Sequence, residues 1–227
     1  MLKVQKNSEN TVDLDKMNSM TNALQISRLL KQNNPSPKTE LVYKNEYEFT
    51  VAVMLSAQTT DKKVNQVTPA LFKKYPDWKS LAEADLSEVR TLIKQVNFYL
   101  GKGERIIKAA QYILTNYRGV LPQTISELIK IPGIARKSAN VIMQELWDQA
   151  EGIVVDTHVS RISQRLRLTK NSDPIKIEKD LMNLIPREYW RNFSGSAVLH
   201  GRYICIARKP KCGECVLNKI CPSAFKV

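Results

Sequence analysis

The chain has 227 residues, of which 43% are hydrophobic, so it can bury a substantial core in one large domain or two small ones. Its 35 Lys and Arg residues outnumber 22 Asp and Glu, and the net charge of +13 favours a polyanionic partner, with nucleic acid first. This composition favours a folded chain over a disordered one. No segment reaches the roughly 18 apolar residues of a membrane span, and the start lacks the hydrophobic segment of a signal peptide, so we expect an intracellular protein.

Helical periodicity dominates the chain, and the alternation typical of strands is nearly absent. Residues 22–31 show it clearly, because Leu24, Ile26, Leu29 and Leu30 can share one helix face. Capping residues and Pro or Gly breaks divide the chain into about ten short helices joined by tight loops. The start signals are Asp61, Ser87, Thr124 and Asp173, and the stop signals are Tyr75, Gly119 and Pro186.

Residues 124–147 contain two helical stretches separated by a turn whose residues cannot be helical. A capping-box pattern at Thr124 starts a short helix, and the apolar spacing of residues 136–147 predicts a second one. Pro132 and Gly133 force a hairpin between them. The sequence therefore predicts a helix, a hairpin and a helix, and the N–H groups that begin the second helix can bind a DNA phosphate.

Lys137 stands in the first turn of that second helix, beside Arg136, and no acidic residue occurs between positions 128 and 143. The helix dipole disfavours a positive charge at this end, which favours the neutral and nucleophilic form of the amine. Such an amine can form a Schiff base with a carbonyl or sugar carbon. An ordinary helical corner with a basic N-terminus gives the same local pattern, so both interpretations stay open at this point.

Asp156 follows the apolar run 153–155 and directly precedes an amphipathic helical stretch. This is the position of an N-cap residue. Capping does not exclude catalysis, because a carboxylate there can stabilise positive charge that develops on a sugar ring or activate a nucleophile. The adjacent His158 is expected to be a structural hydrogen-bonding residue rather than a catalyst.

The four cysteines of the chain lie within 17 residues near its C-terminal end, in the pattern C-x6-C-x2-C-x5-C. They are too clustered to cross-link a chain of this length, so the pattern predicts a metal site formed by Cys205, Cys212, Cys215 and Cys221. Four thiolates suit zinc and an iron–sulfur cluster equally well. The loop between the first two ligands displays three cations, Arg208, Lys209 and Lys211.

Two polar breaks divide the chain, one over residues 31–40 and the other over residues 148–153. They suggest that the N-terminal helix packs with the region after residue 150. The residues between the breaks would then form a continuous helical domain.

Three motifs carry a family resemblance: "IPGIARKSANVI" from 131, "VVDTHVSR" from 154, and the four-cysteine tail preceded by "LHGRYICIARKPKC". Together with "MLSAQTTD" from 54, they resemble endonuclease III, a DNA glycosylase with helix-hairpin-helix DNA binding. The order and spacing agree from about Leu24 to Cys221.

The resemblance implies an all-α, two-domain helix-hairpin-helix glycosylase fold. A six-helix domain would span 39–150, and an iron–sulfur cluster domain would combine 16–38 with 151–227, after a polar extension over 1–15. The four cysteines would hold a mainly structural [4Fe-4S] cluster.

The resemblance also assigns roles to single residues. Lys137 would be the nucleophile and Asp156 the catalytic aspartate. Gln58 would fill the space left by an extruded nucleotide and Phe98 would be an apolar wedge beside it, although both could instead be core residues. The remaining DNA contacts would come from the hairpin and the cationic loop, at Pro132, Gly133, Ile134, Ala135, Arg136, Arg208, Lys209 and Lys211.

The implied reaction is removal of oxidised pyrimidines from double-stranded DNA, followed by β-elimination at the abasic site through a lysine Schiff base. The enzyme would act as a monomer, in the cytoplasm and associated with the nucleoid of a bacterium or archaeon. Two alternatives stay open: a monofunctional adenine-type glycosylase, which ordinarily lacks the hairpin lysine, and a non-catalytic, metal-braced DNA-binding protein.

Two positions depart from the family pattern. Ala135 and Asn97 stand where the family usually has glycine. If Ala135 occupies a left-handed or close-approach position, it costs about 1 kcal/mol and weakens DNA binding. Asn97 tolerates a left-handed conformation better than most residues, so we expect the loop to persist there.

Overall fold

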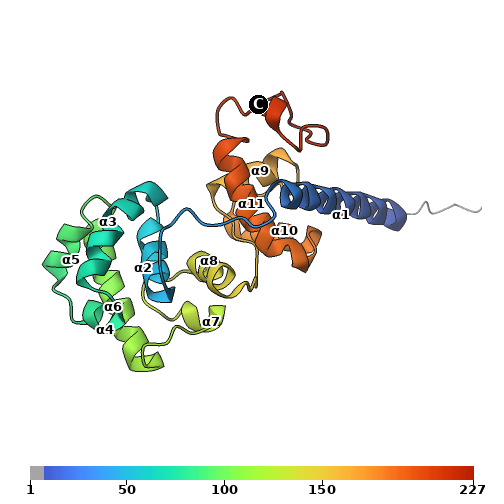
Figure 1. The fold of residues 1–227 in the computed structure, drawn as a ribbon. Helices are drawn as coiled ribbons and strands as arrows, with labels where there is room; N and C mark the ends of the chain where they lie inside the picture. The colour runs from blue at the N-terminus through green and yellow to red at the C-terminus, as the bar shows by residue number, and fades with distance from the viewer. Residues whose placement is uncertain (1–7) are drawn as a thin grey trace, which may run out of the picture. The chain divides into compact units, whose positions relative to one another are not determined.

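The computed structural model describes residues 8–227, with side chains from residue 17 onward. Within this range the protein is entirely helical, with eleven α-helices, two 3-10 helices and no strand (Figure 1). The all-α expectation is therefore confirmed. Part of the expected N-terminal extension, residues 1–7, lies outside the described residues, and the rest belongs to α1 (Ser8–Asn33). In the described part of the chain, no helix has the length and apolar character needed to cross a membrane.

The described chain forms two compact units, each with its own hydrophobic core. The central unit spans Lys38–Glu151. The terminal unit combines the residues up to Pro37 with Gly152–Val227, so the two ends of the chain fold together.

The central unit is built around α2, which is buried along most of its length, from Tyr47 to Leu55. α2 packs against α3, α6 and α8, and α4 and α5 pack against α6. The helices of this unit are α2 (Glu46–Ser56), α3 (Asp61–Lys74), α4 (Trp78–Ala82), α5 (Leu86–Leu92), α6 (Tyr99–Tyr117), α7 (Ile125–Leu128) and α8 (Arg136–Trp147).

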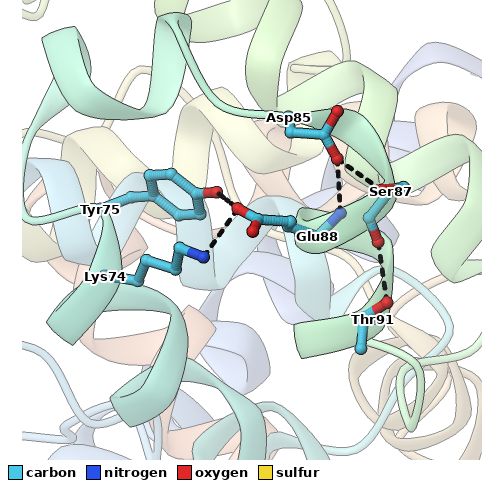
Figure 2. A network of polar contacts seen from close by, with 6 residues as sticks. All are labelled: Lys74, Tyr75, Asp85, Ser87, Glu88 and Thr91. Carbon is cyan, nitrogen blue, oxygen red and sulfur yellow. Dashed lines mark hydrogen bonds and ion pairs between the residues drawn. The ribbon is translucent and has the colours of Figure 1, made fainter.

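A polar network joins the end of α3 to the start of α5 (Figure 2). The carboxylate of Glu88 accepts a hydrogen bond from Tyr75 Oη at 2.8 Å and pairs with Lys74 Nζ at 2.7 Å. Asp85 is the N-cap of α5 and accepts from the Glu88 backbone N–H at 3.0 Å. The expected helix start at Ser87 is therefore wrong by two residues, because the Asp85 carboxylate caps the helix and Ser87 only donates to it.

The terminal unit is centred on α11 (Trp190–Tyr203), which packs against α1 and against α9 (Thr157–Arg165). Its core includes fully buried side chains from all three helices, among them Ile26, Val159 and Phe193. The other helices of this unit are α10 (Pro174–Leu184), η1 (Arg187–Tyr189) and η2 (Cys212–Glu214).

The polar segment that follows α1 is fixed to α11. The Asn192 side-chain amide donates to the backbone carbonyls of Asn34, at 2.9 Å, and Pro35, at 3.0 Å. Gly195 contacts Pro37 so closely that a Cβ on this glycine would lie 2.7 Å from the proline ring. The segment 31–40, expected as a linker, is therefore held against α11 at residues 34 and 35.

Candidate functional site

The turn before α8 requires glycine. Thr124 caps α7 by accepting from the Glu127 N–H at 3.3 Å, as the capping pattern predicted. After α7 the chain turns through Gly133, whose φ is +87°, and a Cβ there would lie 2.9 Å from Met54 Cε and 3.2 Å from Arg105 Cβ. Both the left-handed backbone and the close approach exclude a larger residue without strain.

The first turn of α8 carries Lys137 at the surface, with its side chain exposed. Ala135 is the N-cap, and no side chain caps this helix, so its N-terminus can accept an external anion. The expected left-handed strain at Ala135 is wrong: its φ of −84° and ψ of 164° are extended values that alanine adopts freely. Lys130, another cation of this turn, pairs with Glu127 at 2.6 Å.

The hairpin residues differ in their availability for DNA. Gly133, Ala135 and Arg136 are exposed and Pro132 is partly exposed. Ile134 is only 4% exposed, and its backbone N–H already donates to the Ile131 carbonyl at 3.1 Å. The side chain of Ile134 belongs to the core of the central unit, and a DNA contact by this residue stays a prediction.

Gln58 and Phe98 both lie on the surface of the central unit, in left-handed conformations with φ of 55° and 59°. The core alternatives for them are wrong, since Gln58 is exposed and Phe98 is 67% exposed. The structure brings their loops together: Asn97, next to Phe98, donates through Nδ2 to the Gln58 carbonyl at 2.6 Å. Asn97 was expected to tolerate a left-handed conformation, but the left-handed residue of this loop is Phe98.

Asp156 is the N-cap of α9, as predicted. One oxygen, Oδ1, accepts from the backbone N–H groups of His158 and Val159, both at 2.8 Å. Within the described residues the second oxygen, Oδ2, makes no such bond, so it is available to a substrate. His158 has a structural contact, with its Nδ1 at 3.2 Å from Arg161 Nη2.

The four cysteines line a small cavity of about 30 Å³ in the terminal unit and form no disulfide. In the described residues, no group of three or more His, Cys, Asp or Glu side chains could hold one metal ion. Four thiols that line one cavity are the ligand set that an iron–sulfur cluster uses. Burial and the neighbouring thiols raise the pKa of Cys215 and Cys221, so four thiolates need a cationic centre to stay together.

Arg165, at the end of α9, fixes the loop between the first two cysteines. Its guanidinium donates to Cys205 Sγ at 3.3 Å and to the carbonyls of Ile206, at 2.8 Å, and Ala207, at 2.9 Å. The three cations of this loop are exposed, as expected for a DNA-binding surface; they are Arg208, Lys209 and Lys211.

Two buried polar residues, His200 and Lys102, were not expected from the sequence. His200, 3% exposed, has Nε2 at 3.4 Å from Cys215 Sγ, and burial lowers the pKa of its imidazole to about 4. Lys102, 4% exposed, lies under the Gln58 loop. Lys102 could have been found by its spacing, because it falls on the apolar face of α6 with Ile106 and Ile113.

Comparison with known proteins matches residues 51–187 to the HhH-GPD superfamily of base excision DNA repair proteins. Residues 205–221, which contain the four cysteines, match the iron–sulfur binding domain of endonuclease III. Endonuclease III of Synechocystis sp. is 48% identical over 202 residues, covering 89% of this chain and 92% of the relative. The chain belongs to the endonuclease III family. The expected resemblance is thereby confirmed.

Solved structures of endonuclease III have the same fold. A non-covalent endonuclease III–DNA complex superposes with a TM-score of 0.82 at 35% identity, covering 88% of this chain and 94% of that one. A trapped endonuclease III–DNA covalent intermediate gives a TM-score of 0.81 at 35% identity, over 87% and 93%. The protein carries a [4Fe-4S] cluster, as members of this family do, and its four cysteines lie in the matched iron–sulfur segment.

Proposed function

We propose that the protein removes oxidised pyrimidines from double-stranded DNA and then cleaves the abasic site by β-elimination. It is a DNA glycosylase with abasic-site lyase activity, acting in base excision repair. The observation that carries the residue assignment is the placement of an exposed lysine, Lys137, in the first turn of a helix that no side chain caps. Such a helix start can hold a DNA phosphate while the amine reaches the adjoining sugar.

Base removal requires that the damaged nucleotide leave the stack, at a cost of a few kcal/mol that is smallest for damaged pairs. Gln58 and Phe98 support this step, because both are exposed on neighbouring loops and held in conformations that project from the surface. The hairpin at Gly133 and the cationic loop Arg208–Lys211 supply the contacts to the phosphate backbone. These contacts contribute electrostatic affinity for DNA, which decreases as the salt concentration rises.

The chemistry follows from one amine and one carboxylate. The Lys137 Nζ lone pair bonds to C1′ of the deoxyribose, and the C1′–N bond breaks with its electron pair and a proton going to the base. Opening of the sugar ring gives a Schiff base, loss of a C2′ proton expels the 3′ phosphate, and water releases Lys137. Asp156 supports these steps through Oδ2 by stabilising positive charge on the sugar.

The iron–sulfur cluster takes no part in these bond changes and serves as a brace when bound. Cys205, Cys212, Cys215 and Cys221 hold it, and Arg165 ties the same loop to α9. The loop cations are thereby fixed for phosphate contacts. We further propose that the protein acts as a monomer in the cytoplasm and associates with the nucleoid of a bacterium or archaeon; a cytoplasmic location agrees with its bacterial relatives.

Borohydride trapping tests the proposal directly. Purified protein is incubated with duplexes that carry one thymine glycol, uracil, abasic site or mismatched adenine, and covalent adducts are resolved by denaturing gel. We expect base release from thymine glycol and an adduct with thymine glycol and abasic duplexes. The adduct should disappear in Lys137→Ala.

The matched control is Lys108→Ala, which removes an exposed lysine of α6 that pairs with Glu104 at 2.7 Å. This variant should trap DNA as the unchanged protein does. Base release from mismatched adenine without any adduct would favour the adenine-type alternative. Binding without base release on all four duplexes would contradict the glycosylase assignment.

A further inference from the structure

The loop that follows α2 contains an unfavourable backbone conformation at its tip. Gln58 has a φ of 55°, a region that few residues other than glycine occupy, and its side chain is exposed. A strained residue at a surface tip persists only when its surroundings hold it there. The flanking residues, Ala57 and Thr59, are therefore the places to look for the restraint.

The restraint comes from below the loop, from α6. Lys102 Nζ donates to the carbonyl of Ala57 at 2.6 Å and to Thr59 Oγ1 at 2.9 Å, one acceptor on each side of Gln58. A third bond reaches the Leu55 carbonyl at 2.7 Å, in the last turn of α2. A cation at a helix C-terminus is favoured by the helix dipole and satisfies carbonyls that lack helical partners.

The same cluster reaches the second loop. Thr59 Oγ1, already an acceptor for Lys102, also accepts from the Asn97 backbone N–H at 3.2 Å. Asn97 in turn donates through its side chain to the Gln58 carbonyl and directly precedes Phe98. One buried ammonium group thus stands beneath both exposed side chains, with Thr59 as the shared acceptor.

The three acceptors require the charged form of the side chain. An ammonium group has three N–H donors and a neutral amine only two, so the observed geometry matches the protonated lysine. Burial, with a smaller contribution from Arg105, lowers the pKa of Lys102 to about 8. At neutral pH the side chain is still mostly protonated, and its bonds are charge-assisted in a site with little water.

We propose that Lys102 is a positioning residue for DNA insertion: it holds residues 57–59 in the shape that presents Gln58 to the duplex. This inference rests on the proposed function, in which Gln58 fills the space left by the extruded nucleotide. Lys102 itself is 4% exposed and acts only through the loop.

A double-mutant cycle tests the inference. Single-turnover base removal from a thymine glycol duplex is measured for the unchanged protein, Gln58→Ala, Lys102→Met and the double variant. A second readout is the fluorescence of 2-aminopurine opposite an abasic analogue, which rises when the stack opens. Lys102→Met should slow base removal by about tenfold or more, the equivalent of one charge-assisted hydrogen bond. The double variant should be no slower than the slower single variant.

Two further variants separate positioning from stability. Lys108→Met removes an exposed charge from the same helix and should leave both readouts unchanged. Thr59→Val removes the shared acceptor from a partly exposed loop position without disturbing the core, and it should slow base removal in the same non-additive way. Thr59→Val therefore tests the positioning role even if Lys102→Met does not fold.

The outcomes distinguish this inference from the proposed function. If Gln58→Ala is slow while Lys102→Met and Thr59→Val match the unchanged protein, the positioning role is refuted and the glycosylase assignment stands. Additive rate losses in the cycle also refute it, because Lys102 would then act apart from Gln58. If the unchanged protein neither removes the base nor opens the stack, the proposed function itself fails.

Discussion

The side-chain amide of Asn97 donates a hydrogen bond to the backbone carbonyl of Gln58 across 2.6 Å. The two residues lie 39 positions apart in the chain, and both are exposed. Their contact joins the two loops that carry the residues proposed to enter the duplex. Loss of this contact should therefore affect DNA insertion more than it affects folding.

Replacement of Asn97 by alanine tests this expectation. We predict that Asn97→Ala slows single-turnover base removal several-fold, since a surface hydrogen bond contributes about 0.5–1.5 kcal/mol. The midpoint of urea unfolding should change little. Asn116→Ala is a matched control, because Asn116 is also exposed and donates to the Tyr112 carbonyl of its own helix at 2.9 Å. Equal activities of the two variants would contradict the prediction.

Gly133→Ala should reduce both stability and DNA binding. The left-handed φ of +87° and the contact with Met54 predict a loss of about 1–2 kcal/mol or more in the free energy of unfolding. Gly101→Ala is the comparison, since a Cβ on this helical glycine meets nothing within 4 Å. This substitution should increase the free energy of unfolding by about 0.5–1 kcal/mol. Urea unfolding measures the first effect and salt-dependent binding of an abasic duplex the second. Similar stability of the two variants would argue against the strained turn.

Asp156→Asn separates capping from catalysis. Asparagine caps helices as well as aspartate does, so α9 should keep its stability, whereas Asp156→Ala should lose about 1 kcal/mol. Both variants should slow base removal by about 100-fold or more, because both remove the carboxylate. Asp173→Asn, at the N-cap of α10, serves as control for the substitution itself. Full activity in Asp156→Asn would exclude a catalytic role for the carboxylate.

The buried ammonium of Lys102 predicts a pH-dependent stability. Its pKa is about 8 in the folded protein and near 10.5 when unfolded, so between these values the unfolded chain binds more protons. The free energy of unfolding should therefore rise from about pH 8 to pH 10.5 relative to that of Lys102→Met, by up to about 1.4 kcal/mol per unit of pH. Below pH 8 the difference should be constant. Urea unfolding of both proteins at several pH values measures this difference in the free energy of unfolding. A difference that stays constant up to pH 10 would contradict the prediction.

Features set by local sequence were predictable. The caps at Thr124 and Asp156 and the start of α8 at residue 136 follow from short-range patterns and occur as expected. The all-helical class follows in the same way from apolar periodicity. In each case the side chain that decides the structure lies within a few residues of the backbone that it fixes.

Features set by tertiary contacts were not predictable. Ala135 is extended rather than left-handed, and the left-handed residue near the wedge is Phe98 rather than Asn97. Backbone angles in such loops depend on distant partners, as the hydrogen bonds across to Gln58 show. The position of Lys102 on the apolar face of α6 is visible in the sequence, but its three oxygen partners follow only from the fold.

The hydrogen bond between Asn192 and the Asn34 carbonyl joins residues 158 positions apart. During synthesis, α1 leaves the ribosome long before α11 exists, so it waits without its packing partner. The central unit meets no such delay, because its chain is continuous, and it can complete its core while residues after 151 are still being translated. Nascent chains stalled when residue 151 has just left the ribosomal exit tunnel, before α11 emerges, should therefore contain a protease-resistant central unit and an N-terminal helix that is still cleavable.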